Sequence, residues 1–326
     1  MGTRKMKSKL PYIVNKNLQV EICTIGYKAI GESIVLFVKV DSNIVFSAVI
    51  DSYCYNGVNK TIEILKNNNV ETIDYFCWTH PDDDHSKGLD ELFNDFIDEN
   101  TLINIPENAE INSEKCSDST IDIFNMLKAN LGKRGAKSGK RYKVYTVSDF
   151  KELLANEDDL EILYNEKQYC LEIKSIAPNS QLIRDDFLLD RFCKNKHSIA
   201  FIIYFGNNVF LFTGDIENPT IKQFKRKNIP SSLSYLKIPH HGSKGSDSLL
   251  EYIDYIDVSC VTSYVRGSSR NPEKEVLDRY QEVSKKVYSS YNIEGENNDD
   301  FGIIYTTFDI LNELHTTKLE GNACLL

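Results

Sequence analysis

The feature that most constrains the fold of this chain is a pattern of predicted segments that occurs twice. Each copy begins with strands and continues with helices between further strands. In the first copy, three segments rich in β-branched residues are divided by turn signals and predict an antiparallel meander over 18–25, 33–40 and 43–50. Helical spacing follows at 58–65, then a short apolar strand at 73–78 and an amphipathic run at 89–97.

The second copy begins after a less regular stretch, in which helices are predicted near 121–131 and 147–154. Its predicted strands are 171–176, 197–205, 209–212, 236–238, 258–262, 287–289 and 301–308, and its predicted helices are 216–227, 247–253 and 273–283. Two such copies favour an α+β fold with two sheets packed face to face and helices outside.

Charge and cysteine usage narrow the functional class. The 38 basic and 48 acidic side chains give a net charge of −10, so any contact with nucleic acid has to be local. The eight cysteines occur singly, without a C-x-x-C pair, which is typical of reduced thiols in a reducing compartment. No signal-peptide core and no membrane-length apolar segment is visible. We therefore expect a soluble cytoplasmic protein without membrane contact, whose oligomeric state the sequence leaves open.

Metal-binding side chains cluster between the strand at 73–78 and the following helix. His80, Asp82, Asp84 and His85 occur there in the spacing H-x-D-x-D-H. A strand end holds the backbone in place while the side chains point into open space. Imidazole and carboxylate both suit zinc or manganese, although an acidic surface loop with two incidental histidines has the same composition.

Two later strand ends carry similar groups. Asp215 follows an apolar strand and a glycine turn, and the pair His240 and His241 follows the strand at 236–238. Four of the six histidines therefore lie at strand ends. This repetition favours one shared site over an incidental loop.

Several blocks of sequence together resemble a known family. They are Gly31-Glu32-Ser33-Ile34, Ile50-Asp51, Thr79 to His85, Asn195 to Ile199, Thr213-Gly214-Asp215 and Pro239 to Lys244. In this order they resemble the metallo-β-lactamase superfamily, in particular the branch containing the hydrolase domain of the DNA-uptake competence protein ComEC. The resemblance implies a four-layer αββα sandwich over 18–326, with a tail over 1–17 and an insertion at about 101–165.

The resemblance also implies a centre of two divalent ions, zinc or manganese. It assigns His80 and Asp82 to one ion, Asp84 and His85 to the other, Asp215 to the bridging position and His240 to the late histidine position. For His241, ligation and a supporting role both remain open. In this family a hydroxide bridging the ions attacks the substrate, and Asp84 could orient it as a catalytic residue.

Two positions depart from the family pattern. Asn271 stands in Arg270-Asn271-Pro272-Glu273 where the branch usually has a histidine before proline, which implies a looser second site or one selective for manganese or magnesium. His197 is an additional histidine that could supply a ligand. A histidine opening an apolar strand is more often a hydrogen-bonded structural residue.

Two groups of cations are candidates for contact with phosphate. One is an interleaved basic and glycine-containing loop with Lys133, Arg134, Lys137, Lys140, Arg141 and Lys143. The other is Lys244, placed just after the paired histidines and counted with Asp84 as a candidate catalytic residue. Either could bind a phosphate backbone, or be merely solvated.

The leading hypothesis is therefore a metal-dependent phosphodiesterase or nuclease acting on nucleic acid or a nucleotide. The same chemistry could act on a lactone, thioester or other ester, because a fold does not define a substrate. Asn271 motivates a further alternative, a non-catalytic module that binds metal or a partner.

Overall fold

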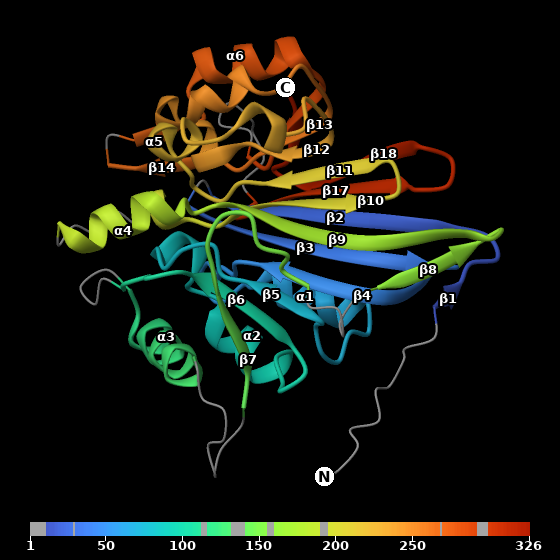
Figure 1. Cartoon of the computed structure of the whole chain (residues 1–326), viewed down its shortest axis with the longest axis horizontal. Helices are drawn as coiled ribbons and strands as arrows, with labels where there is room; N and C mark the ends of the chain where they lie inside the picture. The colour runs from blue at the N-terminus through green and yellow to red at the C-terminus, as the bar shows by residue number, and fades with distance from the viewer. Residues whose placement is uncertain are drawn as a thin grey trace.

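The structure is a computed structural model that describes residues 11–28, 30–111, 116–131, 141–154, 160–189, 195–267, 269–291 and 299–326. Two large sheets pack against each other, and helices cover both outer faces (Figure 1). The α+β class and the four-layer αββα order predicted from the sequence are confirmed.

The first sheet joins the N-terminal strands to strands from the C-terminal part of the chain. Its order within the described residues is β18 (Leu314–Gly321), β17 (Gly302–Asp309), β2 (Leu18–Tyr27), β3 (Gly31–Val40), β4 (Asn43–Ile50), β5 (Tyr75–Cys77), β6 (Leu102–Pro106) and β7 (Lys143–Val147). β2, β3 and β4 form the predicted antiparallel meander, while β4 to β7 run parallel. The four parallel strands direct their C-terminal ends to one edge.

The second sheet is formed mainly by the middle of the chain. Its order is β1 (Tyr12–Ile13), β8 (Glu161–Tyr164), β9 (Lys167–Ala177), β10 (Ala200–Phe205), β11 (Asn208–Phe212), β12 (Ser232–Lys237), β13 (Tyr255–Val261), β16 (Ser284–Ser289) and β19 (Cys324–Leu325). β11, β12, β13 and β16 are parallel. A separate hairpin is formed by β14 (Tyr264–Arg266) and β15 (Ser269–Asn271).

Helices complete the two outer layers. The α-helices are α1 (Lys60–Asn67), α2 (Leu89–Asp95), α3 (Asp118–Asn130), α4 (Ser180–Leu188), α5 (Asn218–Ile221) and α6 (Lys274–Val283). The 3-10 segments are η1 (Asp83–His85), η2 (Asn195–His197), η3 (Arg226–Asn228), η4 (Pro239–Gly242) and η5 (Lys244–Glu251). α1, α2 and α3 cover the first sheet, whereas α5, η5 and α6 cover the second (Figure 1).

The central apolar layer lies between the sheets and follows from the alternation of side chains along each strand. Leu36 of β3 points into this layer, together with Phe201 and Ile203 of β10. The neighbours Val35 and Phe37 on β3 instead pack under the helices of the outer layer. A strand buried on both faces has a continuous apolar run, as Ile34 to Val38 of β3 do.

Part of the local prediction was wrong. The helix predicted at 147–154 does not form, because the chain there runs along β9: the Phe150 amide donates to the Ser175 carbonyl and the Leu153 amide to the Ile173 carbonyl. The backbone N–H groups of this segment therefore form hydrogen bonds to β9 and not the bonds of a helix. The long strand β18 had not been predicted; its side chains are half-exposed, without a strong apolar pattern.

No helix within the described residues is long and apolar enough to cross a lipid bilayer.

Candidate metal centre

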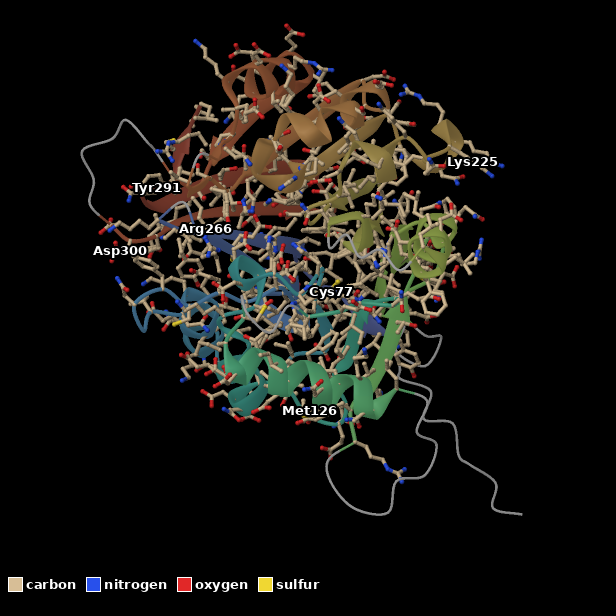
Figure 2. All side chains as sticks on the ribbon, turned by 90° about the vertical axis from the view of Figure 1, so that its left-hand side faces the viewer. Cys77, Met126, Lys225, Arg266, Tyr291 and Asp300 are labelled. Atoms are coloured by element: carbon tan, nitrogen blue, oxygen red, sulfur yellow. The ribbon has the colours of Figure 1, made fainter. Side chains whose placement is uncertain are left out.

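The candidate site lies where the C-terminal ends of strands from both sheets meet. Asp51 follows β4, the turn 79–85 follows β5, Asp215 follows β11 and the His240 turn follows β12. The hairpin β14–β15 and helix α4 lie at this edge, on the left of Figure 1, and Figure 2 looks onto it with Cys77 of β5 near the middle. Ligands commonly bind at the carboxyl ends of parallel strands because loops there are free to carry polar groups.

The turn after β5 is held in place by the hydrogen bonds of Ser86. The Ser86 hydroxyl donates to the Asp82 carbonyl over 2.5 Å and accepts from the indole N–H of Trp78 over 3.0 Å. His85 ends the short η1 segment and is fully buried. The turn therefore presents its imidazoles from a backbone that is itself anchored.

Asp215 is positioned by the glycine that precedes it. Gly214 has φ +48°, and a Cβ there would lie 2.4 Å from the Ser198 hydroxyl oxygen and 3.0 Å from the Ile199 carbonyl oxygen. The Ser198 hydroxyl accepts a hydrogen bond from the Asp215 amide over 3.0 Å. Only glycine allows the backbone at position 214 to lie this close to Ser198 and Ile199. This close packing brings the Asp215 carboxylate to the turn after β5.

His240 and His241 adopt an uncommon backbone conformation. Their φ values are 47° and 54°, in the left-handed region that non-glycine residues rarely occupy. The His240 amide donates to the Gly214 carbonyl, which ties this turn to the Asp215 turn. Strained backbone of this kind is concentrated at functional sites.

One group of ligand atoms consists of Asp84, His85, Asp215 and His241, whose ligand atoms lie within 4.8 Å of one another. The His85 Nε2 lies 3.5 Å from Asp215 Oδ1 and 3.7 Å from Asp84 Oδ2. The His241 Nε2 lies 3.4 Å from Asp84 Oδ2 and 3.7 Å from Asp215 Oδ2. These four side chains surround a single point.

A second group adjoins the first through the same Asp215 carboxylate. The His80 Nε2 lies 3.6 Å from Asp82 Oδ2 and 3.8 Å from Asp215 Oδ2. The His240 Nε2 lies 4.0 Å from Asp215 Oδ2, and its ring is 23% exposed and also faces Glu217 at 3.4 Å. Asp215 thus contacts histidines of both groups.

Hydrogen bonds on the far side of three rings define which nitrogen carries a proton. The Thr79 hydroxyl donates to Asp51 over 2.6 Å, so at 3.0 Å it accepts from the Nδ1 of His80. His85 Nδ1 faces the Asp51 carboxylate at 2.7 Å, and His241 Nδ1 faces the Thr262 carbonyl at 3.1 Å. Each Nδ1 is therefore a donor, and each neutral ring has its lone pair on Nε2.

The inward atoms fit a divalent cation. The Nε2 atoms of His80, His85 and His241 and the Oδ1 of Asp215 are buried without a hydrogen-bond partner among the described residues. Ligand atoms around one tetrahedral zinc ion are about 3.3–3.6 Å apart, and most distances in the two groups are close to this spacing. Buried polar atoms without partners destabilise a fold, and one cation in each of the two groups would satisfy these atoms.

The charges of the centre compensate one another. Burial lowers the pKa of His85, but Asp215, Asp51 and Asp84 outweigh this and hold that pKa well above its usual value. Burial also lowers the pKa of His241, and Asp215 and Glu32 raise it overall. For Asp215, burial raises the pKa, whereas His85, His241 and His240 bring it well below the usual range. The carboxylates and the histidines of the centre therefore shift one another's pKa values in opposite directions, each favouring the charged form of the other.

Other residues singled out from the sequence lie around this centre or away from it. His197 is in η2 rather than in a strand, and its Nε2 is 3.5 Å from Asp186 of α4. Asn271 lies on β15 opposite Tyr264, whose ring stacks on His241 with centroids 5.1 Å apart. His197 does not belong to the groups of ligand atoms described above, and a ligand role for Asn271 stays a prediction.

The candidate phosphate-binding cations have separate surroundings. The Lys244 Nζ forms an exposed ion pair with Glu275 at 2.9 Å. Lys133, Arg134, Lys137 and Lys140 lie outside the described residues, whereas Arg141 is described and exposed. Phosphate binding by this loop therefore stays a prediction.

Sequence reasoning had not assigned a role to Asp51, Glu32, Lys237 or Thr262, which surround the histidines on their outer side. Burial raises the pKa of Glu32, but Lys237, His241 and His85 lower it to about 2, so this buried carboxyl is ionised. A lysine inside the apolar run Leu236-Lys237-Ile238 was the available signal, because buried lysines require a partner.

Neither a protein-family model nor a curated protein sequence matches this chain. Some solved structures are similar to this chain at low identity. A candidate metal-dependent hydrolase from Parabacteroides distasonis is 12% identical, with a TM-score of 0.41 over 81% of this chain and 96% of that chain. A diphosphatase of the PhnP family is 13% identical, with a TM-score of 0.34 over 74% of this chain and 86% of that chain.

Proposed function

We propose that this chain is a metal-dependent hydrolase that cleaves a phosphodiester, in nucleic acid or in a nucleotide. The observation that carries the proposal is the convergence on the Asp215 carboxylate of three buried Nε2 atoms that have no hydrogen-bond partner in the described part of the chain. A purely structural histidine cluster would use both ring nitrogens in hydrogen bonds.

Two divalent ions, zinc or manganese, would share Asp215. One would be held by His80, Asp82, Asp215 and His240, and the other by Asp84, His85, Asp215 and His241. Bound there, such ions polarise the substrate and activate water. For His80, His85 and His241, the hydrogen bonds of Nδ1 support the tilt of the ring.

Asp84 is the candidate catalytic carboxylate. Its side chain is 13% exposed, in contrast to the fully buried rings of His80 and His85. It can therefore accept a hydrogen bond from a water molecule at the open side of the site and orient it toward the substrate.

The choice of a phosphodiester rests on resemblance and charge. The motifs 79–85, 213–215 and 239–244 resemble a DNA-handling branch of the metallo-β-lactamase superfamily. Arg266 is an exposed cation on β14, two residues after the Tyr264 that stacks on His241 (Figure 2). Lys244 adds a second cation whose exposed pair with Glu275 contributes little stability and can open for a phosphate.

The proposal is tested by incubating the purified chain with single-stranded DNA, double-stranded DNA, RNA, a chromogenic phosphodiester and a carboxylic ester, each with manganese or zinc. Cleavage of a phosphodiester is expected, and Asp84→Asn should abolish it. Asp122→Asn, an exposed acid on α3, is the matched control. Hydrolysis of the carboxylic ester alone would contradict the phosphodiester as substrate and indicate an esterase. Metal binding without any turnover would support a non-catalytic module.

A further inference from the structure

A buried ion pair connects the two sheets directly behind the candidate metal centre. Lys237 ends β12 of the second sheet, and its Nζ lies 2.8 Å from Oε2 of Glu32 on β3 of the first sheet. Both side chains are almost fully buried, at 1% and 3% exposed. Placing both charges in the interior is unfavourable unless further polar contacts satisfy them.

Those further contacts lead to the histidines. The Thr262 hydroxyl donates to Glu32 Oε2, and the Nδ1 of His241 lies 3.4 Å from the same oxygen. The other carboxylate oxygen, Oε1, is 3.9 Å from the Nδ1 of His85. Glu32 therefore faces one histidine from each of the two sheets.

Thr262 repeats the arrangement of Thr79 on the opposite side of the centre. The Thr79 hydroxyl donates to Asp51 and accepts from His80, so its orientation is defined. The Thr262 hydroxyl donates to Glu32 and lies 3.0 Å from the Nδ1 of His241, so it accepts from that ring and shares its N–H with the Thr262 carbonyl. In each case a carboxylate orients a hydroxyl, and the hydroxyl orients an imidazole.

Glu32, Asp51 and His85 form a group that could by composition hold a cation of its own. Its surroundings argue otherwise. The ammonium of Lys237 already neutralises Glu32, and Asp51 accepts hydrogen bonds from the amide and the hydroxyl of Thr79 and from His85. The group therefore supports the neighbouring ligands and is not a separate metal site.

We propose that Lys237 and Glu32 are positioning residues, which act through Thr262 to hold the Nε2 of His241 toward Asp84 and Asp215. This inference rests on the proposed metal centre but not on the proposed reaction. The ion pair fixes the position of His241, which follows β12 of the second sheet, relative to His85, which follows β5 of the first sheet. Loss of the pair should weaken metal binding even in a chain that remains folded.

The experiment compares Lys237→Met, Glu32→Gln and the double variant by metal content after dialysis, by calorimetric titration with manganese or zinc, and by thermal unfolding. Each single variant leaves a buried polar group unpaired and should unfold at lower temperature. The double variant should recover most of the thermal stability and still bind metal roughly 10–100-fold more weakly, the typical loss when such outer contacts are removed. Lys39→Met with Glu21→Gln removes a partly buried pair elsewhere in the first sheet and is the control.

A second pair of variants keeps the test independent of folding. Thr262→Val removes the hydroxyl that links Glu32 to His241 and should weaken metal binding, whereas Thr262→Ser retains the hydroxyl and should restore it. Unchanged metal affinity in both the double variant and Thr262→Val would overturn the positioning role and leave a structural ion pair. An unaltered chain that binds no metal would overturn the metal centre itself, and the positioning role with it.

Discussion

The Nδ1 of His85 lies 2.7 Å from the Oδ2 of Asp51, so a residue at the end of β4 determines which nitrogen of this histidine faces the centre. The same carboxylate accepts hydrogen bonds from the amide and hydroxyl of Thr79. One buried acid thus orients two candidate ligands, because the Thr79 hydroxyl in turn accepts from His80.

Replacing this acid should damage both the fold and the centre. In Asp51→Asn an amide N–H₂ must face either the Thr79 amide or the protonated Nδ1 of His85, leaving buried donors unpaired. We expect a loss of about 1–3 kcal/mol in the free energy of unfolding, measured by chemical denaturation. Metal affinity should fall by roughly 10–100-fold in calorimetric titrations. Wild-type affinity in this variant would mean that Asp51 does not orient the ligands.

Gly214 should tolerate no side chain. In Gly214→Ala the new Cβ would meet the Ser198 hydroxyl at 2.4 Å, so Asp215 has to move. Gly57 also has positive φ, at 79°, but nothing lies within 4 Å of its Cβ position. Gly57→Ala should cost only about 1–2 kcal/mol for the left-handed backbone. Gly214→Ala should cost more in thermal unfolding and should also lower the metal content, and equal effects of both variants would contradict the steric argument.

Metal binding should release protons. The pKa values of His85 and His241 are raised in the folded chain, so near neutral pH protons compete with the ion for these rings. As pH rises through these pKa values the competition ends, and metal affinity should increase. Calorimetry at about pH 6 and about pH 8, in buffers of different ionisation enthalpy, measures the proton release. Affinity that does not change with pH would contradict ligation by these rings.

The same protonation has the opposite consequence for the metal-free chain. A raised folded-state pKa contributes stability that is fully present below the unfolded value of about 6.5 and is lost as pH rises through the folded value. The metal-free chain should therefore lose this contribution at higher pH. Saturating manganese or zinc should stabilise the fold by about 2.7 kcal/mol at a hundredfold excess over Kd. Thermal unfolding with and without a chelator should show a difference that grows with pH.

Cations at the edge of the site should affect substrate binding more than turnover. Arg266→Ala and Lys244→Ala should each raise KM for a phosphodiester, by up to roughly tenfold, with a smaller change in kcat. KM for a neutral carboxylic ester should not change. Figure 2 shows Lys225 on the opposite side of this face, so Lys225→Ala is the matched control. Equal effects of all three variants would indicate that the overall charge of the protein attracts the substrate, and that Arg266 and Lys244 do not contact it.

The sequence by itself determined much of the local structure and the type of site. The bounds of β4 (Asn43–Ile50) match the predicted strand, because alternation and turn residues are local signals. The spacing of His80, Asp82, Asp84 and His85 predicted metal chemistry from ligand types alone.

Only the tertiary structure decided which distant residues meet. The pairing of β17 with β2 joins the two ends of the chain, and no local pattern encodes it. The sequence left the role of His241 open, and the fold brings its Nε2 to 3.4 Å from Asp84. Likewise, Lys237 and Glu32 form an ion pair only because two sheets pack in one register. Local periodicity predicts on which face of a strand a side chain lies. The residue that this side chain contacts in the other sheet depends on how the two sheets are stacked.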